Sequence, residues 1–227
     1  KARNYLKKNN FNFKKDSSII RRKYESFIAS WLSSYAEIFP LGYIKFNLYD
    51  LIKAEPDIRS HIIRQSILTI SGKKYLPSEK STENILKNLK FNNKTWSLGG
   101  CLICSKDEEI YIFREIGRIN EKLKITSGRN FIWDNRFRIF FTTDLICDFW
   151  VAALNEEGLS EIEEISPKLR KKPLERLIYM GLPALWSSEG VVACPQLSYN
   201  NRENLSFYSL FEPRHRLIPC SFAVVND

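Results

Sequence analysis

The spacing of apolar residues changes near Thr95, and this change constrains the fold more than any other feature of the sequence. Before it, apolar side chains recur every three to four residues, as in amphipathic helices. After it, they alternate in "TWSLGGCLIC" and "EIYIFREIG", as in half-buried strands. We therefore predict an α+β protein, with a basic all-helical domain over 1–94 and a mixed domain over 95–227 that holds a curved, mainly antiparallel sheet.

Start and stop signals place the helices of the first domain. Apolar residues from Ile20 to Ile38 predict a helix over 17–38. Asn47 can cap a short helix, and Pro56 suits the first turn of a helix over 57–71 that Gly72 would end. A further helix is expected over 79–91.

Turn residues separate the expected elements of the second domain. "SKDEE" predicts a hairpin, and Asp134-Asn135 predicts another turn. "LICDFWVAAL" is typical of a buried strand, and "PALWSSEGVVACP" of two strands joined by a turn. "SEIEEI" and "PLERLIYMG" predict short helices, the second beginning at Pro173 and ending at Gly181.

The net charge of +9 is unevenly distributed. Residues 1–100 hold 19 Lys and Arg against 8 Asp and Glu, a net charge of +11, whereas residues 101–227 have a net charge of −2. This asymmetry favours a polyanionic partner such as nucleic acid. The alternative is a solvated basic surface. No apolar run approaches the roughly 18–20 residues of a membrane helix, so no membrane partner is predicted.

The five cysteines are an odd number in a chain too large to need disulfides, which predicts reduced thiols and a cytoplasmic protein. Cys101 and Cys104 form a C-x-x-C, but a zinc site would need a second ligand pair, so no metal is predicted. The simpler interpretation is two small apolar side chains in a strand. A thiol enzyme that uses Cys101 is a weak alternative, because His215 lies about 110 residues away and nothing local supports the pairing.

Gly99 and Gly100 raise the question of a phosphate cradle. Such a cradle needs several glycines that lead into a helix, usually with Lys, Ser or Thr. "LGGCLIC" leads into a strand and lacks those residues, so we predict a kink or bulge that lets a sheet bend or another backbone approach. No catalytic residue is assigned.

Several phrases of the sequence together resemble a known family. "WSLGGCLI", "YIFRE", "FIWDNRFRI" and "GLPALWSSEGVVACPQL" are similar, in this order, to the C-terminal part of bacterial tRNA(Ile)-lysidine synthetases. "IRSHIIRQSILTISGKKYLP" resembles the family's helix ahead of that region. The resemblance covers about residues 50–200.

The resemblance implies a ligase that adenylates the wobble cytidine of a minor isoleucine tRNA and then attaches lysine. In the family, an N-terminal domain with an S-G-G-x-D-S loop carries the chemistry and would need ATP and Mg²⁺. That loop is absent here, and the only methionine is Met180. We therefore expect a piece of a longer protein, with no cofactor of its own, that grips the tRNA body. Whether this chain itself counts as an enzyme stays open.

Scattered cations on helices suit contacts with RNA phosphates, which fix register and carry little sequence information. For Arg114 the alternative is structural, a cross-strand ion pair with Glu115. For Trp133 and Phe137 the alternative is a role as core aromatic side chains. A module for protein interaction or homodimerisation without RNA affinity is the competing function. The predicted tRNA-binding residues are Arg21, Arg22, Lys23, Arg59, Arg64, Lys73, Lys74, Lys87, Arg114 and Arg136.

Overall fold

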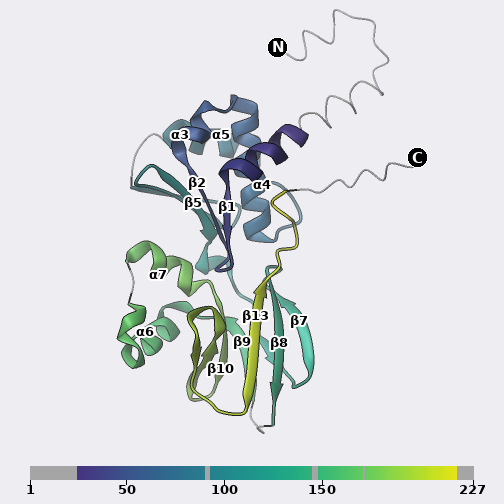
Figure 1. The fold of residues 1–227 in the computed structure, drawn as a ribbon, viewed down its shortest axis with the longest axis vertical. Coiled ribbons are helices and arrows are strands. Elements are labelled where there is room, and N and C mark those ends of the chain that lie inside the picture. Colours follow the sequence, from purple (N-terminus) through teal and green to yellow (C-terminus); the bar gives the residue numbers. More distant parts are fainter. Residues whose placement is uncertain (1–24, 90–92, 145–147, 171, 219–227) are drawn as a thin grey trace, which may run out of the picture.

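The computed structural model describes residues 25–89, 93–144, 148–170 and 172–218. Within this part of the chain the strands form three sheets, and every strand pairing is antiparallel. One sheet lies with helices α3, α4 and α5 in an upper unit, and the other two lie in a lower unit with α6 and α7 (Figure 1). The predicted α+β class with mainly antiparallel sheets is confirmed.

The upper sheet has five strands in the order β1-β2-β5-β4-β3. Because β1 and β2 precede residue 94, the prediction of an all-helical first domain is wrong. The division at 94 and 95 stays a prediction, although this sheet joins strands from both sides of it. The strands are β1 (Glu37–Phe39), β2 (Tyr43–Asn47), β3 (Lys94–Leu98), β4 (Cys101–Lys106) and β5 (Glu109–Arg114).

The helices of the upper unit begin and end largely where their capping residues predict. The Tyr49 amide donates to the Asn47 side chain 2.8 Å away and so starts α3 (Leu48–Lys53). Pro56 is the first residue of α4 (Pro56–Ser71), and Gly72 ends it in a left-handed conformation. The next helix, α5 (Glu79–Asn88), ends earlier than predicted, and 90–92 lie outside the described residues.

The first predicted helix, 17–38, is described only from residue 25, and it ends at residue 35. Ile38, which was expected on its apolar face, instead lies in β1 and pairs with Ile44. Ile28 and Leu32 of this helix pack with α4 against one face of the upper sheet. This packing buries the alternate strand residues Ile44, Phe46, Ile103, Ile110 and Ile112.

Two sheets enclose the core of the lower unit, in the orders β12-β11-β10-β9-β6 and β13-β8-β7. The Phe141 and Phe149 rings, one from each sheet, lie 5.6 Å apart across this core. The strands are β6 (Leu123–Ile125), β7 (Arg129–Trp133), β8 (Phe137–Thr143), β9 (Phe149–Ala153), β10 (Pro183–Ser187), β11 (Gly190–Cys194), β12 (Tyr199–Asn200) and β13 (Leu205–Phe211).

Short helices flank these sheets. The two predicted from "SEIEEI" and "PLERLIYMG" are confirmed as α6 (Asn155–Ile165) and α7 (Pro173–Met180). The described part of the chain also contains three single turns of 3₁₀ helix, η1 (Ile116–Arg118), η2 (Pro167–Leu169) and η3 (Pro195–Leu197). None of the helices described here has both the length and the apolar character needed to cross a bilayer.

We predict that Gly158→Ala destabilises the protein by about 1–3 kcal/mol, although alanine is ordinarily the better helix former. A Cβ at Gly158 would lie 2.7 Å from both Trp186 Cη2 and Val191 Cγ2, so α6 would have to move off the sheet. Gly117→Ala is the matched control, because no atom lies within 4 Å of its Cβ position. Urea unfolding measures both, and equal stabilities of the two variants would contradict this packing.

Candidate nucleic-acid interface

A buried ion-pair cluster joins the upper and lower units. Asp134, in the turn between β7 and β8, accepts hydrogen bonds from Arg114 Nε at 2.9 Å and from Arg136 Nε at 2.7 Å. Arg114 Nη2 donates to the other oxygen of Asp134 at 3.0 Å, so this pair is bidentate. Arg114 comes from β5 of the upper sheet, whereas the other two residues belong to the lower unit.

Backbone carbonyls complete the partners of both guanidinium groups. Arg114 donates to Gly100 O at 2.6 Å and to Arg118 O at 2.9 Å, and Arg136 donates to Gly181 O at 3.0 Å. Burial lowers the pKa of Arg136, and the Asp134 carboxylate opposes that effect. The cluster therefore connects the turn at Asp134 with the backbone at Gly100, Arg118 and Gly181, which lie far apart in the sequence.

Arg114 and Arg136 are 7% and 1% exposed, so their guanidinium groups present almost no surface to an RNA phosphate. They hold the fold together, and no RNA contact is assigned to them. The expected cross-strand ion pair between Arg114 and Glu115 is wrong. Arg114 forms its ion pair with Asp134, whereas Glu115 accepts a hydrogen bond from Ser97. Trp133 and Phe137 are fully buried core aromatics, as the structural alternative predicts.

Gly99 and Gly100 form the two-residue turn of a hairpin between β3 and β4, with φ of +66° and +89°. The prediction of a kink or bulge inside one strand is therefore wrong, since both residues need the left-handed conformation of a tight turn. The close approach of another backbone is also not found, since the atoms nearest to both turn residues belong to side chains. A Cβ at Gly99 would lie 2.7 Å from Ile67 Cγ2, and one at Gly100 would lie 2.7 Å from Arg114 Nη1.

The two cysteines of the C-x-x-C lie on opposite faces of β4, because side chains alternate along a strand. Cys101 packs in the core under α4, and its thiol contacts Ile67 O at 3.6 Å, whereas Cys104 packs with Phe113 and Ile178. Burial raises the pKa of Cys101 to about 12, which disfavours the nucleophilic thiolate. Among the described residues no group of three His, Cys, Asp or Glu side chains is placed to hold a metal ion.

Arg59 and Lys87 lie in a groove between α4 and α5 that is rich in carboxylates. Asp57, Glu79 and Glu83 line the same groove, so acidic groups outnumber the two cations there. Arg59 also donates to Ala54 O at 3.0 Å. This groove is a poor phosphate site. Three other predicted cations, Arg21, Arg22 and Lys23, lie outside the described residues.

Lys73 and Lys74 are exposed in the loop after α4, next to the junction of the two units. Gly72 packs so closely on Asn135 that a Cβ there would lie 2.6 Å from Asn135 Cβ. Arg64 braces the loop by donating to Pro77 O at 2.9 Å. Tyr75 is 74% exposed, with Lys74 Nζ 5.4 Å from its ring centroid. Two exposed lysines thus stand beside an accessible aromatic ring on a fixed loop.

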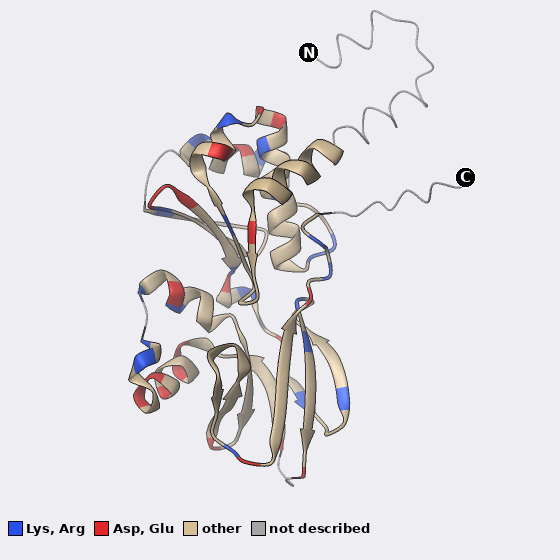
Figure 2. Ribbon diagram, viewed as in Figure 1, with Lys and Arg blue, Asp and Glu red and all other residues tan. Residues whose placement is uncertain are grey.

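The structure adds three arginines that the sequence analysis missed. Arg138, Arg214 and Arg216 line a cavity of about 570 Å³ together with Asn135, on the same side of the junction as the Gly72 contact. Positions of Lys and Arg occur along this side of the junction, whereas all the charged residues of α6 are Glu (Figure 2). For Arg214 and Arg216, the sequence feature that could have indicated this site is the short basic run "EPRHR", which follows the last strand, β13.

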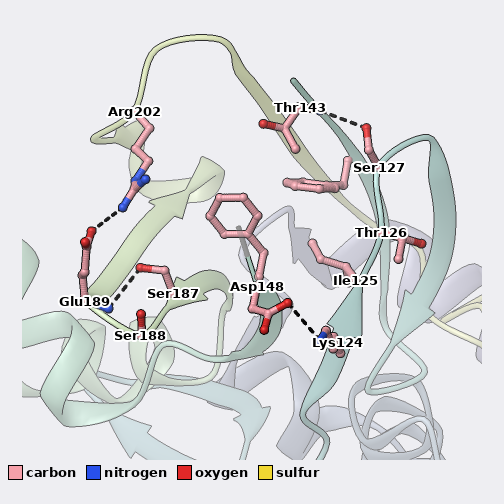
Figure 3. Close-up of a pocket in the computed structure, with 12 residues that line it drawn as sticks. Lys124, Ile125, Thr126, Ser127, Thr143, Asp148, Ser187, Ser188, Glu189 and Arg202 are labelled. Carbon is pink, nitrogen blue, oxygen red and sulfur yellow. Dashed lines mark hydrogen bonds and ion pairs between the residues drawn. The ribbon is translucent and has the colours of Figure 1, made fainter. Parts of the chain in front are cut away.

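A second cavity, of about 700 Å³, lies in the lower unit between β6, β9 and the ends of neighbouring strands. Hydroxyl groups line it, and its charged residues are paired, Lys124 with Asp148 at 2.9 Å and Arg202 with Glu189 (Figure 3). Its described lining contains no histidine or cysteine. With its charges neutralised and no activated nucleophile, it is a weaker candidate for phosphate binding or catalysis than the junction.

No protein-family model matches the chain. Curated proteins do match it over 210 residues: the tRNA(Ile)-lysidine synthases of Rickettsia africae at 27% identity, and of Rickettsia felis and Rickettsia bellii at 28%. The chain resembles the tRNA(Ile)-lysidine synthases. This similarity covers 88% of the chain and confirms the resemblance carried by the sequence motifs. The chain spans only 42–47% of the length of these relatives.

We predict that Asp134→Ala destabilises the protein by about 3–5 kcal/mol, because two buried guanidinium groups lose their carboxylate. The matched control is Asp148→Ala, which removes a carboxylate whose pair with Lys124 is exposed, and should cost less than about 1 kcal/mol. Denaturant unfolding of both variants measures the difference. A loss at Asp134 no larger than that at Asp148 would show that the buried cluster is not essential.

We predict that the Cys101 thiol of the folded protein resists alkylation at about pH 8, where an ordinary cysteine of pKa about 8.5 reacts. A raised pKa keeps the thiol protonated below the folded pKa of about 12, and burial excludes the reagent. Peptide mass spectrometry after iodoacetamide treatment, with and without urea, checks this. Fast labelling of Cys101 in the native protein would revive the thiol-enzyme hypothesis.

Proposed function

We propose that this chain is the tRNA-binding, non-catalytic C-terminal part of a tRNA(Ile)-lysidine synthase. The observation that carries the proposal is the similarity to these synthases over 88% of the chain. Many charged groups of the chain are buried or form ion pairs. By contrast, the cations beside the junction are exposed, namely Lys73, Lys74, Arg214 and Arg216. Cations of this kind neutralise phosphates and release counterions, which is the main source of affinity for RNA backbone.

The chemistry would belong to another part of a longer, cytoplasmic protein. In this proposal the partner is the minor isoleucine tRNA, and the ligase reaction uses ATP and Mg²⁺ in the catalytic domain. The residues of the present chain do not fit a nucleotide site: the sequence contains no S-G-G-x-D-S loop, and the Gly99-Gly100 turn is filled by Ile67 and Arg114. No adenylation chemistry is therefore assigned to them.

A module for protein interaction or homodimerisation is the second candidate function. The observation that favours it is a set of exposed apolar side chains on the face of the β13–β8–β7 sheet that points away from the core. Phe140, Tyr208 and Leu210 are 40%, 64% and 58% exposed there. This function predicts a salt-insensitive homodimer without RNA affinity, so gel filtration beside a tRNA binding assay separates the two candidates.

We predict that the chain binds tRNA with an affinity that falls steeply with salt, and that it does not hydrolyse ATP. Lys73→Glu with Lys74→Glu should weaken binding at least tenfold and reduce the salt slope by about one unit for each RNA phosphate that is no longer neutralised. Fluorescence anisotropy with labelled tRNA over a series of salt concentrations measures both quantities.

Lys168→Glu with Arg170→Glu is the matched control. It reverses two exposed cations at η2, which packs against α6 away from the loop after α4. This pair changes the net charge by the same amount and should alter affinity only slightly. Equal reductions of affinity in both double variants would mean that net charge, not the junction, attracts the RNA. Absence of any tRNA binding at low salt would refute the proposed function.

A further inference from the structure

We propose that the arginine cavity at the junction and the adjoining outer face of the β13–β8–β7 sheet together bind unpaired nucleotides of the RNA. This inference rests on the proposed function and specifies which part of an RNA this surface accepts. In it, Arg214 and Arg216 hold a backbone phosphate, while Phe140 and Tyr208 stack on a base.

The cavity keeps a positive charge because its single carboxylate is already paired. Glu212 accepts hydrogen bonds from Arg138 Nε at 2.5 Å and from Arg138 Nη2 at 2.9 Å, and the bond from Arg138 holds the pKa of Glu212 below its usual value. Among the residues described, no acidic side chain forms an ion pair with Arg214 or Arg216. Two guanidinium groups thus remain available for an anion.

The backbone that carries these two arginines is fixed on both sides. The Arg214 amide donates to Asn135 O at 2.9 Å, and the Glu212 amide donates to Arg136 O at 2.7 Å, both in the turn of the buried cluster. From the upper unit, Gln65 Nε2 donates to Arg216 O at 3.0 Å. The segment is therefore positioned before a ligand arrives, which reduces the entropy that binding must offset.

Aromatic side chains continue this surface along the sheet. Tyr208 of β13 pairs directly with Phe140 of β8, and the neighbouring pair on the same face joins Leu210 to Arg138. Residues that pair directly share a face of the sheet. Because Ile139 and Phe141, on either side of Phe140, are buried, the side chains of both pairs point outward. Two exposed aromatic side chains therefore lie next to each other on the sheet, beside the arginine cavity.

Arg138 connects the two parts of this surface. It lines the arginine cavity and lies two residues from Phe140 on one strand, which places these two residues about 6.6–6.8 Å apart on the same face. A base can stack on an aromatic side chain only when it is not enclosed in a duplex, and stacking accepts every base because each has a π-face. The two uncompensated arginines favour this occupant over an apolar protein surface, which would leave both charges unpaired.

Anisotropy titrations with three probes test the inference: tRNA, a short single-stranded oligoribonucleotide, and the duplex of the same sequence. Tyr208→Ala with Phe140→Ala should weaken binding of the single strand roughly tenfold and leave the duplex unchanged. Arg214→Gln with Arg216→Gln should also weaken single-strand binding. Tyr49→Ala is the matched control, since Tyr49 is likewise 64% exposed but lies on α3, and it should change nothing.

The outcomes separate this inference from the proposed function. Wild-type binding to tRNA with no effect of the aromatic pair on any probe would overturn the inference and leave the proposed function standing. Loss of a homodimer in that variant, seen by gel filtration, with RNA affinity intact would assign the face to a second copy of the chain. No binding of any probe by the wild type would refute the proposed function itself. Thermal unfolding of each variant verifies that the fold is retained.

Discussion

The carboxylate of Asp134, held between the guanidinium groups of Arg114 and Arg136, is the interaction on which the arrangement of the two units depends. Transfer of charges from water into the interior is costly, and this cluster offsets the cost with a bidentate pair and with three backbone carbonyls. Arg114 comes from β5 of the upper sheet, and Asp134 and Arg136 come from the tight turn between β7 and β8. The carbonyl that Arg136 binds belongs to Gly181, at the end of α7. Loss of the Asp134 carboxylate would leave both buried guanidinium groups without their counter-charge.

The exposed cations take their positions from that buried turn. Gly72 packs against Asn135, which places the loop of Lys73 and Lys74, and the amide of Arg214 donates to Asn135 O, which places the arginine segment. These exposed cations thus lie on short loops of a rigid scaffold, an arrangement that is common at binding sites. A positioning role for the chain requires this rigidity, because phosphate contacts give orientation to a bound RNA only when the cations keep a fixed spacing.

Local signals in the sequence predicted much of the fold. Asn47, Pro56 and Gly72 mark helix ends whose hydrogen bonds lie within a few residues, so α3 and α4 followed from them. The strands β1 and β2 were missed because they are short and because β2 pairs with β5, some 60 residues further along the chain. Gly99-Gly100 suits a tight hairpin turn, but the apolar alternation that continues through it gave the impression of one strand.

The charged site was harder to predict because a sequence shows which residues are cations but not which of them are neutralised. Arg114 and Arg136 have the residue type of a phosphate ligand, yet Asp134 pairs with both of them. Arg59 and Lys87 share a groove with Asp57, Glu79 and Glu83, and the packing of α5 against α4 brings the charges of the two helices together. The run "EPRHR" lies in an irregular segment without periodicity, and its proximity to Lys73 depends on contacts between the units.

Hydrogen–deuterium exchange of the chain in low salt, with and without saturating tRNA, tests most directly the claim that the junction is an RNA-binding surface. We expect slower amide exchange in the loop 73–76 and in the segment 208–216 when tRNA is bound, and unchanged exchange in α6 and α7. Protection confined to α6 and α7, or no protection anywhere while tRNA is bound, would contradict it.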